Sequence, residues 1–70
     1  MANILVIEDQ GSLGSLYQRA LGSIGHDVTI ALTGLAAIAA AETQKPDMVF
    51  LDLMLPRMKA TEVVDRLTRL

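Results

Sequence analysis

Three short, mostly apolar runs divide the chain, at positions 4–7, 28–32 and 48–53. The runs are continuous rather than alternating, and β-branched residues are frequent in the first two. An unbroken apolar run is typical of a strand that is buried on both faces, as in a parallel sheet. The sequence therefore predicts three short parallel strands.

The segment after the first run has the spacing of an amphipathic helix. Its apolar residues recur at steps of three and four and form one stripe: Leu13, Leu16, Tyr17, Ala20, Leu21 and Ile24. We expect Gly25 to end this helix as a C′ residue in the left-handed conformation. Gly14 lies near its beginning and is expected to weaken the first turn by about 1 kcal/mol relative to alanine.

Two further helices are predicted in the remaining segments. Thr33 is the expected N-cap of a helix from about position 34 to position 42. Pro46 ends that helix, because a proline forces the residue before it out of helical geometry. The last helix is expected to begin near Thr61, and the chain stops at Leu70 within its apolar stripe. We therefore expect the chain to be the first half of a larger domain.

The predicted order is strand, helix, strand, helix, strand, helix. Connections between parallel strands are almost always right-handed, so this order describes two βαβ units that share their middle strand. The expected fold class is α/β, with a single domain over residues 1–70.

Composition excludes several classes of function. The chain has 70 residues, no cysteine and a formal net charge of −2, so disulfides, thiolate metal sites and a basic nucleic-acid surface are not expected. No apolar run reaches the length of a membrane span, and no signal peptide is evident. The expected location is the cytoplasm, with neither a membrane nor a nucleic acid as partner.

Acidic residues follow two of the predicted strands. Glu8 and Asp9 come directly after the first strand, and Asp52 lies at the end of the third. The carboxyl ends of parallel strands meet at one edge of a sheet, where ligands bind. Neighbouring carboxylates raise each other's pKa values, and a divalent cation relieves this repulsion. Mg²⁺ fits best, because it takes one or two carboxylates and keeps several waters.

Asp52 differs from the other two acids, because it interrupts an apolar run between Leu51 and Leu53. A carboxylate in such a place needs a partner or a function. Beside Mg²⁺ it can act as a nucleophile toward phosphorus. The alternative is purely structural: Asp52 caps a turn, and Glu8 and Asp9 cap the first helix.

Four stretches resemble the receiver domains of bacterial response regulators. They are Ile4-Leu5-Val6-Ile7-Glu8-Asp9, Gly25-His26-Asp27-Val28, Ala31-x-x-Gly34-x-x-x-Ile38 and Pro46-Asp47-Met48-Val49-Phe50-Leu51-Asp52-Leu53-Met54-Leu55-Pro56. The last is the most specific, and the resemblance covers the whole chain. It implies half of a flavodoxin-like fold, with a three-stranded parallel sheet in the order 2-1-3. The first helix is expected on one face of the sheet, and the second and third on the other.

The resemblance also implies a role for each acidic residue. Asp52 is the phosphoacceptor, and the phosphoryl donor is a histidine kinase or a phosphotransfer protein. Glu8, Asp9 and Asp52 hold Mg²⁺, with Asp9 closer to the ion than Glu8, and the backbone carbonyl of Met54 completes the protein ligands. Pro56 shapes the loop after the phosphoacceptor. The implied protein is a signalling module rather than an enzyme.

The chain departs from the family's pattern in two ways. Lys59-Ala60 stands where family members usually have Asp-Gly, and alanine does not readily adopt a positive φ, so we expect a reshaped loop. The family's fourth strand supplies a Ser or Thr, and its fifth a Lys that contacts the phosphoryl group. Neither strand is present in these residues, so phosphoryl transfer is expected to be impaired. Arg57 and Lys59 are the candidates to supply a positive charge instead.

Two other functions stay open. The third strand of a half domain is an apolar edge, and unpaired edges recruit other chains. We therefore expect a homodimer through the third strand, and a structural homodimer without phosphotransfer is the main alternative. The glycine-rich segment 11–15 weakly resembles a phosphate- or flavin-binding loop, but it lacks the full motifs.

Overall fold

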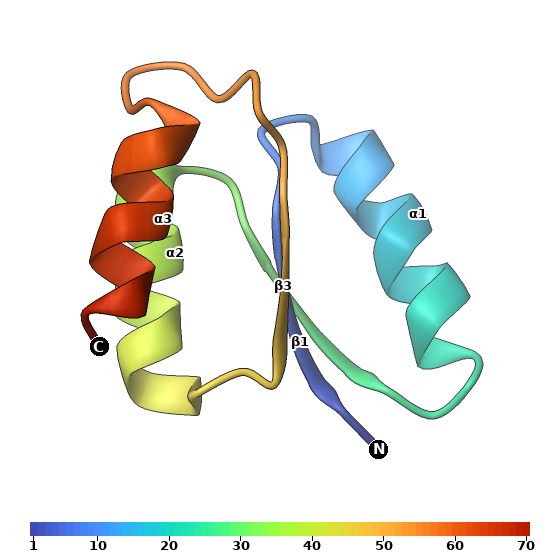
Figure 1. Cartoon of the computed structure of the whole chain (residues 1–70). Coiled ribbons are helices and arrows are strands. Elements are labelled where there is room, and N and C mark those ends of the chain that lie inside the picture. The colour runs from blue at the N-terminus through green and yellow to red at the C-terminus, as the bar shows by residue number, and fades with distance from the viewer.

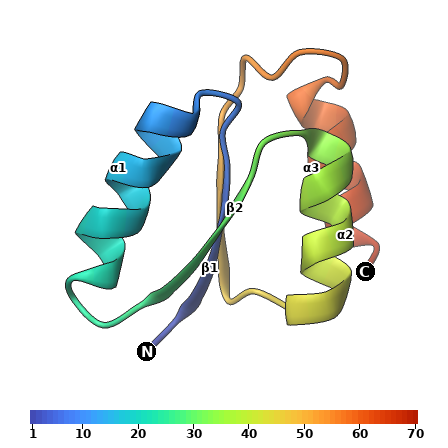
Figure 2. The same ribbon diagram turned by 180° about the vertical axis from the view of Figure 1, so that it is seen from behind.

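A central parallel sheet carries helices on both faces in the computed structural model, which describes all 70 residues (Figures 1 and 2). Its elements are β1 (Asn3–Ile7), α1 (Gly11–Gly22), β2 (Asp27–Ala31), α2 (Gly34–Gln44), β3 (Met48–Leu51) and α3 (Ala60–Thr68). The strands lie in the order β2-β1-β3, and both pairs are parallel. Figure 1 shows α1 on one face, and α2 and α3 on the other. The predicted fold class, strand order and placement of the helices are confirmed.

The central strand, β1, is the most deeply buried element. All four residues of its apolar run, 4–7, are buried, as an unbroken run predicts. Its last residue, Ile7, lies opposite Ala31 of β2 and Leu51 of β3. The three strands therefore end at the same level, and the residues that follow them meet at one rim of the sheet.

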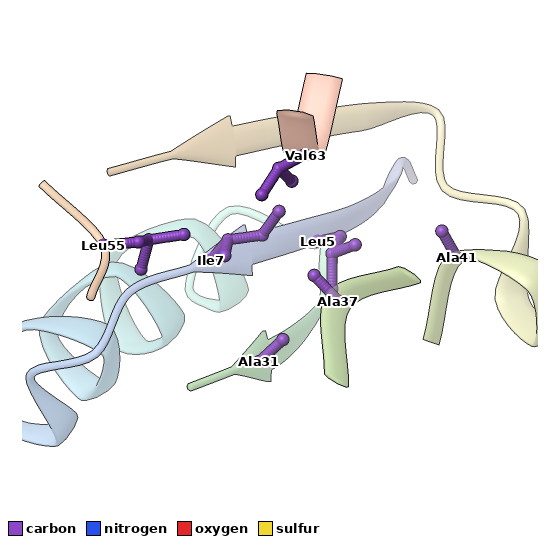
Figure 3. Packing of buried hydrophobic residues seen from close by; sticks show 7 residues of the cluster. All are labelled: Leu5, Ile7, Ala31, Ala37, Ala41, Leu55 and Val63. Carbon is purple, nitrogen blue, oxygen red and sulfur yellow. The ribbon is translucent and has the colours of Figure 1, made fainter. Parts of the chain in front are cut away.

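The hydrophobic core lies between β1 and the layer formed by α2 and α3 (Figure 3). It consists of Leu5, Ile7, Ala31, Ala37, Ala41, Leu55 and Val63. The small side chains of α2 let that helix pack close to the sheet, whereas Val63 is the one fully buried residue of α3. The loop after β3 is held in place by Leu55, which reaches the same core.

Gly25 closes α1 as predicted. Its φ angle is 93°, and its N–H donates to the carbonyl of Gly22 at 3.0 Å. The N–H of His26 donates to the carbonyl of Leu21 at 3.3 Å. These two hydrogen bonds form a Schellman motif, in which the C′ residue is left-handed.

Gly14 has a packing role that the sequence did not reveal. It is buried within α1, and a Cβ at this position would lie 3.2 Å from Cγ2 of Ile30 in β2. The missing side chain therefore sets the distance between α1 and the sheet. The helix loses intrinsic stability at this glycine but gains close contact with β2.

The ends of α2 follow the predicted signals. The hydroxyl of Thr33 accepts a hydrogen bond from the N–H of Ala36 at 3.1 Å, which is the expected N-cap. Lys45, the residue before the proline, is left-handed and ends the helix. The helix runs to Gln44, two residues beyond the predicted end. None of the helices combines the length and apolar character needed to cross a bilayer.

The predicted end of the third strand is wrong by two residues. β3 ends at Leu51, so Asp52 is the first residue after the strand rather than part of it. Leu53 continues the apolar pattern of the sequence, but the residue is 75% exposed. The apolar pattern alone therefore overestimates the length of the strand, because the exposure of Leu53 depends on what packs beside it.

The loop between β3 and α3 does not place a positive φ on Ala60. That residue is the first of α3, and the positive φ of the loop falls on Arg57 instead, at 71°. Lys59 precedes the helix with an extended backbone and makes no capping hydrogen bond from its side chain. The first turn of α3 therefore lacks the cap that the first turn of α2 has.

Replacing Lys59 with aspartate is expected to stabilise the chain by about 1 kcal/mol. The backbone at this position is already extended, as an N-cap requires, and an aspartate oxygen can accept the free N–H groups of the first turn. A negative charge there also interacts favourably with the helix dipole. Urea denaturation of K59D and K59A separates the two effects, since K59A removes the positive charge without adding a cap. Equal stability of the two variants would contradict the capping argument.

Candidate functional site

Three carboxylates meet at the rim of the sheet where the strands end. They belong to Glu8 and Asp9, which follow β1, and to Asp52, which follows β3. One oxygen of each lies within 4.8 Å of one from each of the others. We call these three residues the acidic rim. The sequence predicted that these three side chains lie together. The parallel sheet explains why they do, because the carboxyl ends of its strands meet at one edge.

Backbone hydrogen bonds fix two of the three residues to the neighbouring strands. The N–H of Glu8 donates to the carbonyl of Ala31 at 3.0 Å, and the N–H of Asp52 donates to the carbonyl of Ile7, also at 3.0 Å. Both bonds continue the strand ladders by one residue. The backbones of Glu8 and Asp52 are therefore held by the sheet itself.

The three carboxylates differ in their surroundings. Glu8 is buried, with 6% of its surface exposed, Asp52 is half-buried and Asp9 is exposed. The N–H of Gln10 donates to Oε2 of Glu8 at 3.2 Å. The N–H of Met54 donates to Oδ1 of Asp52 at 3.0 Å. One oxygen of Asp52 is thus oriented by the loop, and its other oxygen stays available.

The pKa of Glu8 reflects these opposing influences. The hydrogen bond from the backbone of Gln10 lowers the pKa, but burial and the nearby carboxyl groups of Asp9 and Asp52 outweigh it. The net result is a pKa raised above the ordinary glutamate value. The acidic rim is therefore under electrostatic repulsion, as expected for carboxylates that share a site.

A hollow of about 540 Å³ begins at the acidic rim and runs along the face of the sheet that carries α1. Apolar side chains line most of it, among them Val6, Leu13, Tyr17, Phe50 and Leu53. The rings of Tyr17 and Phe50 meet edge to face, with their centroids 6.0 Å apart. The sequence does not predict this hollow, because the helical stripe of α1 and the apolar run of β3 do not show how far apart the two elements lie.

Comparison with known proteins identifies the family. The family model for the response regulator receiver domain matches residues 4–70. The chain belongs to this family. The resemblance to receiver domains that the sequence indicated is thereby confirmed, and the acidic rim lies in a receiver domain.

Individual receiver-containing proteins are similar over nearly the whole chain. The alkaline phosphatase synthesis transcriptional regulatory protein PhoP of Bacillus subtilis is 44% identical over 64 residues, which is 91% of this chain. The probable transcriptional regulatory protein TcrX of Mycobacterium tuberculosis is 42% identical over the same share. The crystal structure of the chemotaxis protein CheY4 of Vibrio cholerae superimposes with a TM-score of 0.94 at 28% identity, over 99% of this chain.

The receiver chain spans only part of these proteins. It covers 27% of PhoP and of TcrX, and 57% of the CheY4 chain. The superposition on CheY4 supports the strand order β2-β1-β3 as that of a receiver.

The donor set of the acidic rim fits a hard divalent cation. Two oxygens that bind the same Mg²⁺ at about 2.1 Å lie at most about 4.2 Å apart. The rim oxygens, within 4.8 Å of one another, reach that spacing by small side-chain rotations. Mg²⁺ can also bind such groups through its retained waters. The carbonyl of Met54 stays a predicted ligand.

No basic side chain of the receiver compensates the acidic rim. The chain has two ion pairs, Arg66 with Glu62 and Arg69 with Asp65, and both lie on the exposed side of α3. Arg57 and Lys59, the predicted substitutes for a missing positive charge, make no ion pair. The glycine-rich segment 11–15 forms the first turns of α1, so it is not the flexible loop that a phosphate- or flavin-binding function needs.

Proposed function

We propose that this receiver chain accepts a phosphoryl group on Asp52 from the phosphohistidine of a histidine kinase or a phosphotransfer protein. The observation that carries the proposal is the position of Asp52. Its carboxylate is oriented by the N–H of Met54 and lies within 4.8 Å of the carboxylates of Glu8 and Asp9. A carboxylate in such surroundings is suited to metal-assisted attack on phosphorus.

The reaction forms one bond and breaks one bond. The free oxygen of Asp52 attacks the phosphorus atom, and the P–N bond to the donor histidine breaks. The electron pair of that bond stays on the imidazole nitrogen, and the product is an aspartyl phosphate. Because the N–H of Met54 holds the other carboxylate oxygen, the side chain does not need to reorient during the attack.

Glu8, Asp9, Asp52 and the carbonyl of Met54 are the proposed ligands of Mg²⁺. The ion supplies positive charge that offsets the negative charge gathered around the phosphoryl group. Asp9 is exposed and Glu8 is buried, so we place Asp9 closer to the ion than Glu8. Glu8 also holds the loop before α1, because its side chain accepts a hydrogen bond from the N–H of Gln10.

We expect the transfer to be slower than in a complete receiver. The Ser or Thr and the Lys that the family places on later strands are not among these 70 residues, and no basic side chain pairs with the acidic rim. Each missing donor to the phosphoryl oxygens removes stabilisation from the transition state, by a factor of about 100 or more in comparable sites.

The test is a comparison of Asp52→Asn with Asp27→Asn. Asp27 is exposed at the start of β2, at the opposite end of the sheet. We expect the unmodified chain and D27N to gain a phosphoryl mass with acetyl phosphate and Mg²⁺, and to show chemical-shift changes at the acidic rim with beryllofluoride. D52N should show neither. Modification of D52N to the same extent would refute the role of Asp52.

A structural homodimer is the second candidate function, and the exposed edge of β3 favours it. β3 pairs with β1 on one side only, and the exposed Met48 and the partly exposed Val49 lie on it. Such an edge is a template for another strand. If the chain dimerises but takes up no phosphoryl group under any condition above, the structural function is the correct one.

A further inference from the structure

Beyond Asp52, two side chains of the loop between β3 and α3 pack against the core. Leu55 is part of the core, as described above, and Met58 is partly buried against it. Their neighbours in the loop, such as Met54 and Arg57, are exposed. The loop also carries the N–H that orients Asp52, so the position of that N–H depends on how Leu55 and Met58 are held.

Met58 packs against the first residue of α2. Gly34 is buried there, and a Cβ at this position would lie 2.5 Å from Sδ of Met58. It would also lie 3.0 Å from Cγ2 of Val63 in α3. Figures 1 and 2 show α2 and α3 starting at the same end of the molecule. Carbon atoms in contact stay about 3.5–4.0 Å apart, so the sulfur of Met58 occupies the space that a side chain at position 34 would need.

The backbone of α2 does not itself require glycine at position 34. Gly25 is the only glycine with a positive φ, so alanine could adopt the conformation of Gly34 and would favour the helix. Gly11 is likewise the first residue of its helix, α1, but a Cβ there would meet nothing within 4 Å. Lack of space beside Met58, rather than backbone conformation, therefore explains the need for glycine at position 34.

A strained turn lies between the two packed side chains of the loop. The N–H of Met58 donates to the carbonyl of Pro56 at 2.8 Å, and Arg57 between them has a φ of 71°. This hydrogen bond and this φ are those of a γ-turn of the rare, strained form. A strained backbone persists only where the surrounding contacts fix it. Leu55 on one side of the turn and Met58 on the other supply those contacts.

We propose that Gly34 and Met58 are positioning residues for Asp52. The sulfur of Met58, packed on Gly34, fixes the end of the loop and maintains the strained turn. When Met58 is displaced, the turn relaxes and the segment back to Met54 loses a support. The N–H of Met54 holds Oδ1 of Asp52, and its carbonyl is a proposed ligand of Mg²⁺. The role in phosphoryl acceptance rests on the proposed function of Asp52, whereas the contact between α2 and the loop does not.

The rival explanation is that this contact only stabilises the fold. In that case any substitution that destabilises α2 to the same degree should affect Asp52 equally. Positioning predicts instead that effects on Asp52 follow the collision at position 34. Ala41→Gly separates the two explanations, because Ala41 is buried near the other end of α2 and glycine destabilises a helix interior.

The first test compares Gly34→Ala with Gly11→Ala. The new methyl group of G34A collides with Met58, whereas that of G11A enters open space. We expect G34A to weaken the binding of beryllofluoride in the presence of Mg²⁺ at least about tenfold, and to shift the amide resonance of Met54. G11A and A41G should leave both unchanged. If G34A behaves like the unmodified chain, or if A41G shows the same losses, the proposal is overturned.

The second test removes the collision without restoring the glycine. In a Met58→Ala background no sulfur remains near position 34. The neighbours that remain, Cγ2 of Val63 and Cβ of residue 58, lie at 3.0 Å and 3.3 Å, which small shifts relieve. We expect M58A alone to weaken beryllofluoride binding, because the loop loses a contact, and Gly34→Ala to add little to that loss. If Gly34→Ala weakens binding by the same factor in both backgrounds, Met58 is not the partner of Gly34 and the proposal fails.

The two measurements separate this proposal from the proposed function. The amide resonance of Met54 reports on the loop without a phosphoryl group or a metal, whereas beryllofluoride binding reports on Asp52. If the unmodified chain binds no beryllofluoride, the proposed function fails. A shift of Met54 in G34A but not in G11A would still support the contact between Gly34 and the loop, and no shift in G34A would still refute it.

Discussion

Replacing Glu8 with glutamine is expected to raise the stability of the metal-free chain and to weaken Mg²⁺ binding at least about tenfold. Glu8 is buried beside two other carboxylates, which disfavour its charged form. A neutral amide removes this repulsion, and its oxygen can still accept the hydrogen bond from Gln10. The same change removes one negative charge from the proposed Mg²⁺ site.

The raised pKa of Glu8 also predicts how the free energy of unfolding of the metal-free chain changes with pH. The pKa of Glu8 is raised in the folded chain, so the folded chain keeps a proton at a pH where the unfolded chain has lost it. The free energy of unfolding of the metal-free chain should therefore fall as pH rises from the ordinary glutamate pKa through the raised one. Saturating Mg²⁺ should abolish this fall, since the ion favours the charged carboxylate.

The measurement is a series of urea denaturations across this pH range, with and without Mg²⁺. Glu42→Gln is the matched control, since Glu42 is exposed on α2, away from the acidic rim. E8Q should lose the pH-dependent fall, and E42Q should keep it. A metal-free E8Q that is less stable than the unmodified chain at neutral pH would contradict the repulsion argument.

Replacing Leu55 with alanine is expected to lower the free energy of unfolding by about 3 kcal/mol. Leu55 is 9% exposed and joins the core beside Ile7 (Figure 3). Truncation of a buried leucine removes its transfer free energy and leaves a cavity. A loss of this size is a large share of the total stability of so small a domain.

The same substitution should also loosen the loop that orients Asp52, because Leu55 is the loop's buried anchor. Leu35→Ala is the control, since Leu35 is 68% exposed and its truncation should change stability by no more than about 0.5 kcal/mol. Urea denaturation measures the stability, and amide exchange at Met54 measures the loop. If L55A matches L35A in both, Leu55 does not anchor the loop.

Sequence pattern predicted the elements of this fold well where each pattern had a local cause. The run at positions 4–7 became the buried central strand, Thr33 became an N-cap, and Gly25 became a left-handed helix end. In each case the residue's own backbone preference or burial decides the structure. The order of the strands came from the family resemblance rather than from the pattern.

Features that depend on contacts between elements escaped prediction. The sequence indicated only that Gly14 weakens a helix. In the structure its missing side chain lets α1 pack close to Ile30, which is 16 residues away in sequence. Leu53 continued an apolar run yet lies outside β3. The burial of Glu8 was likewise not visible, because an acidic residue after a strand can lie in solvent or under a loop. The positive φ at Arg57 was likewise not visible in the sequence.

The central position of β1 also has a consequence for the order of assembly during folding. Pairing of β1 with β2 joins residues about 24 positions apart in sequence, whereas pairing of β1 with β3 joins residues about 44 positions apart. Contacts between residues farther apart in sequence form more slowly. We therefore expect Glu8 and Asp9 to be in place before Asp52 arrives, so that docking of the last strand completes the proposed cation site. A divalent ion should consequently slow the undocking of β3 far more than it speeds the collapse of the chain.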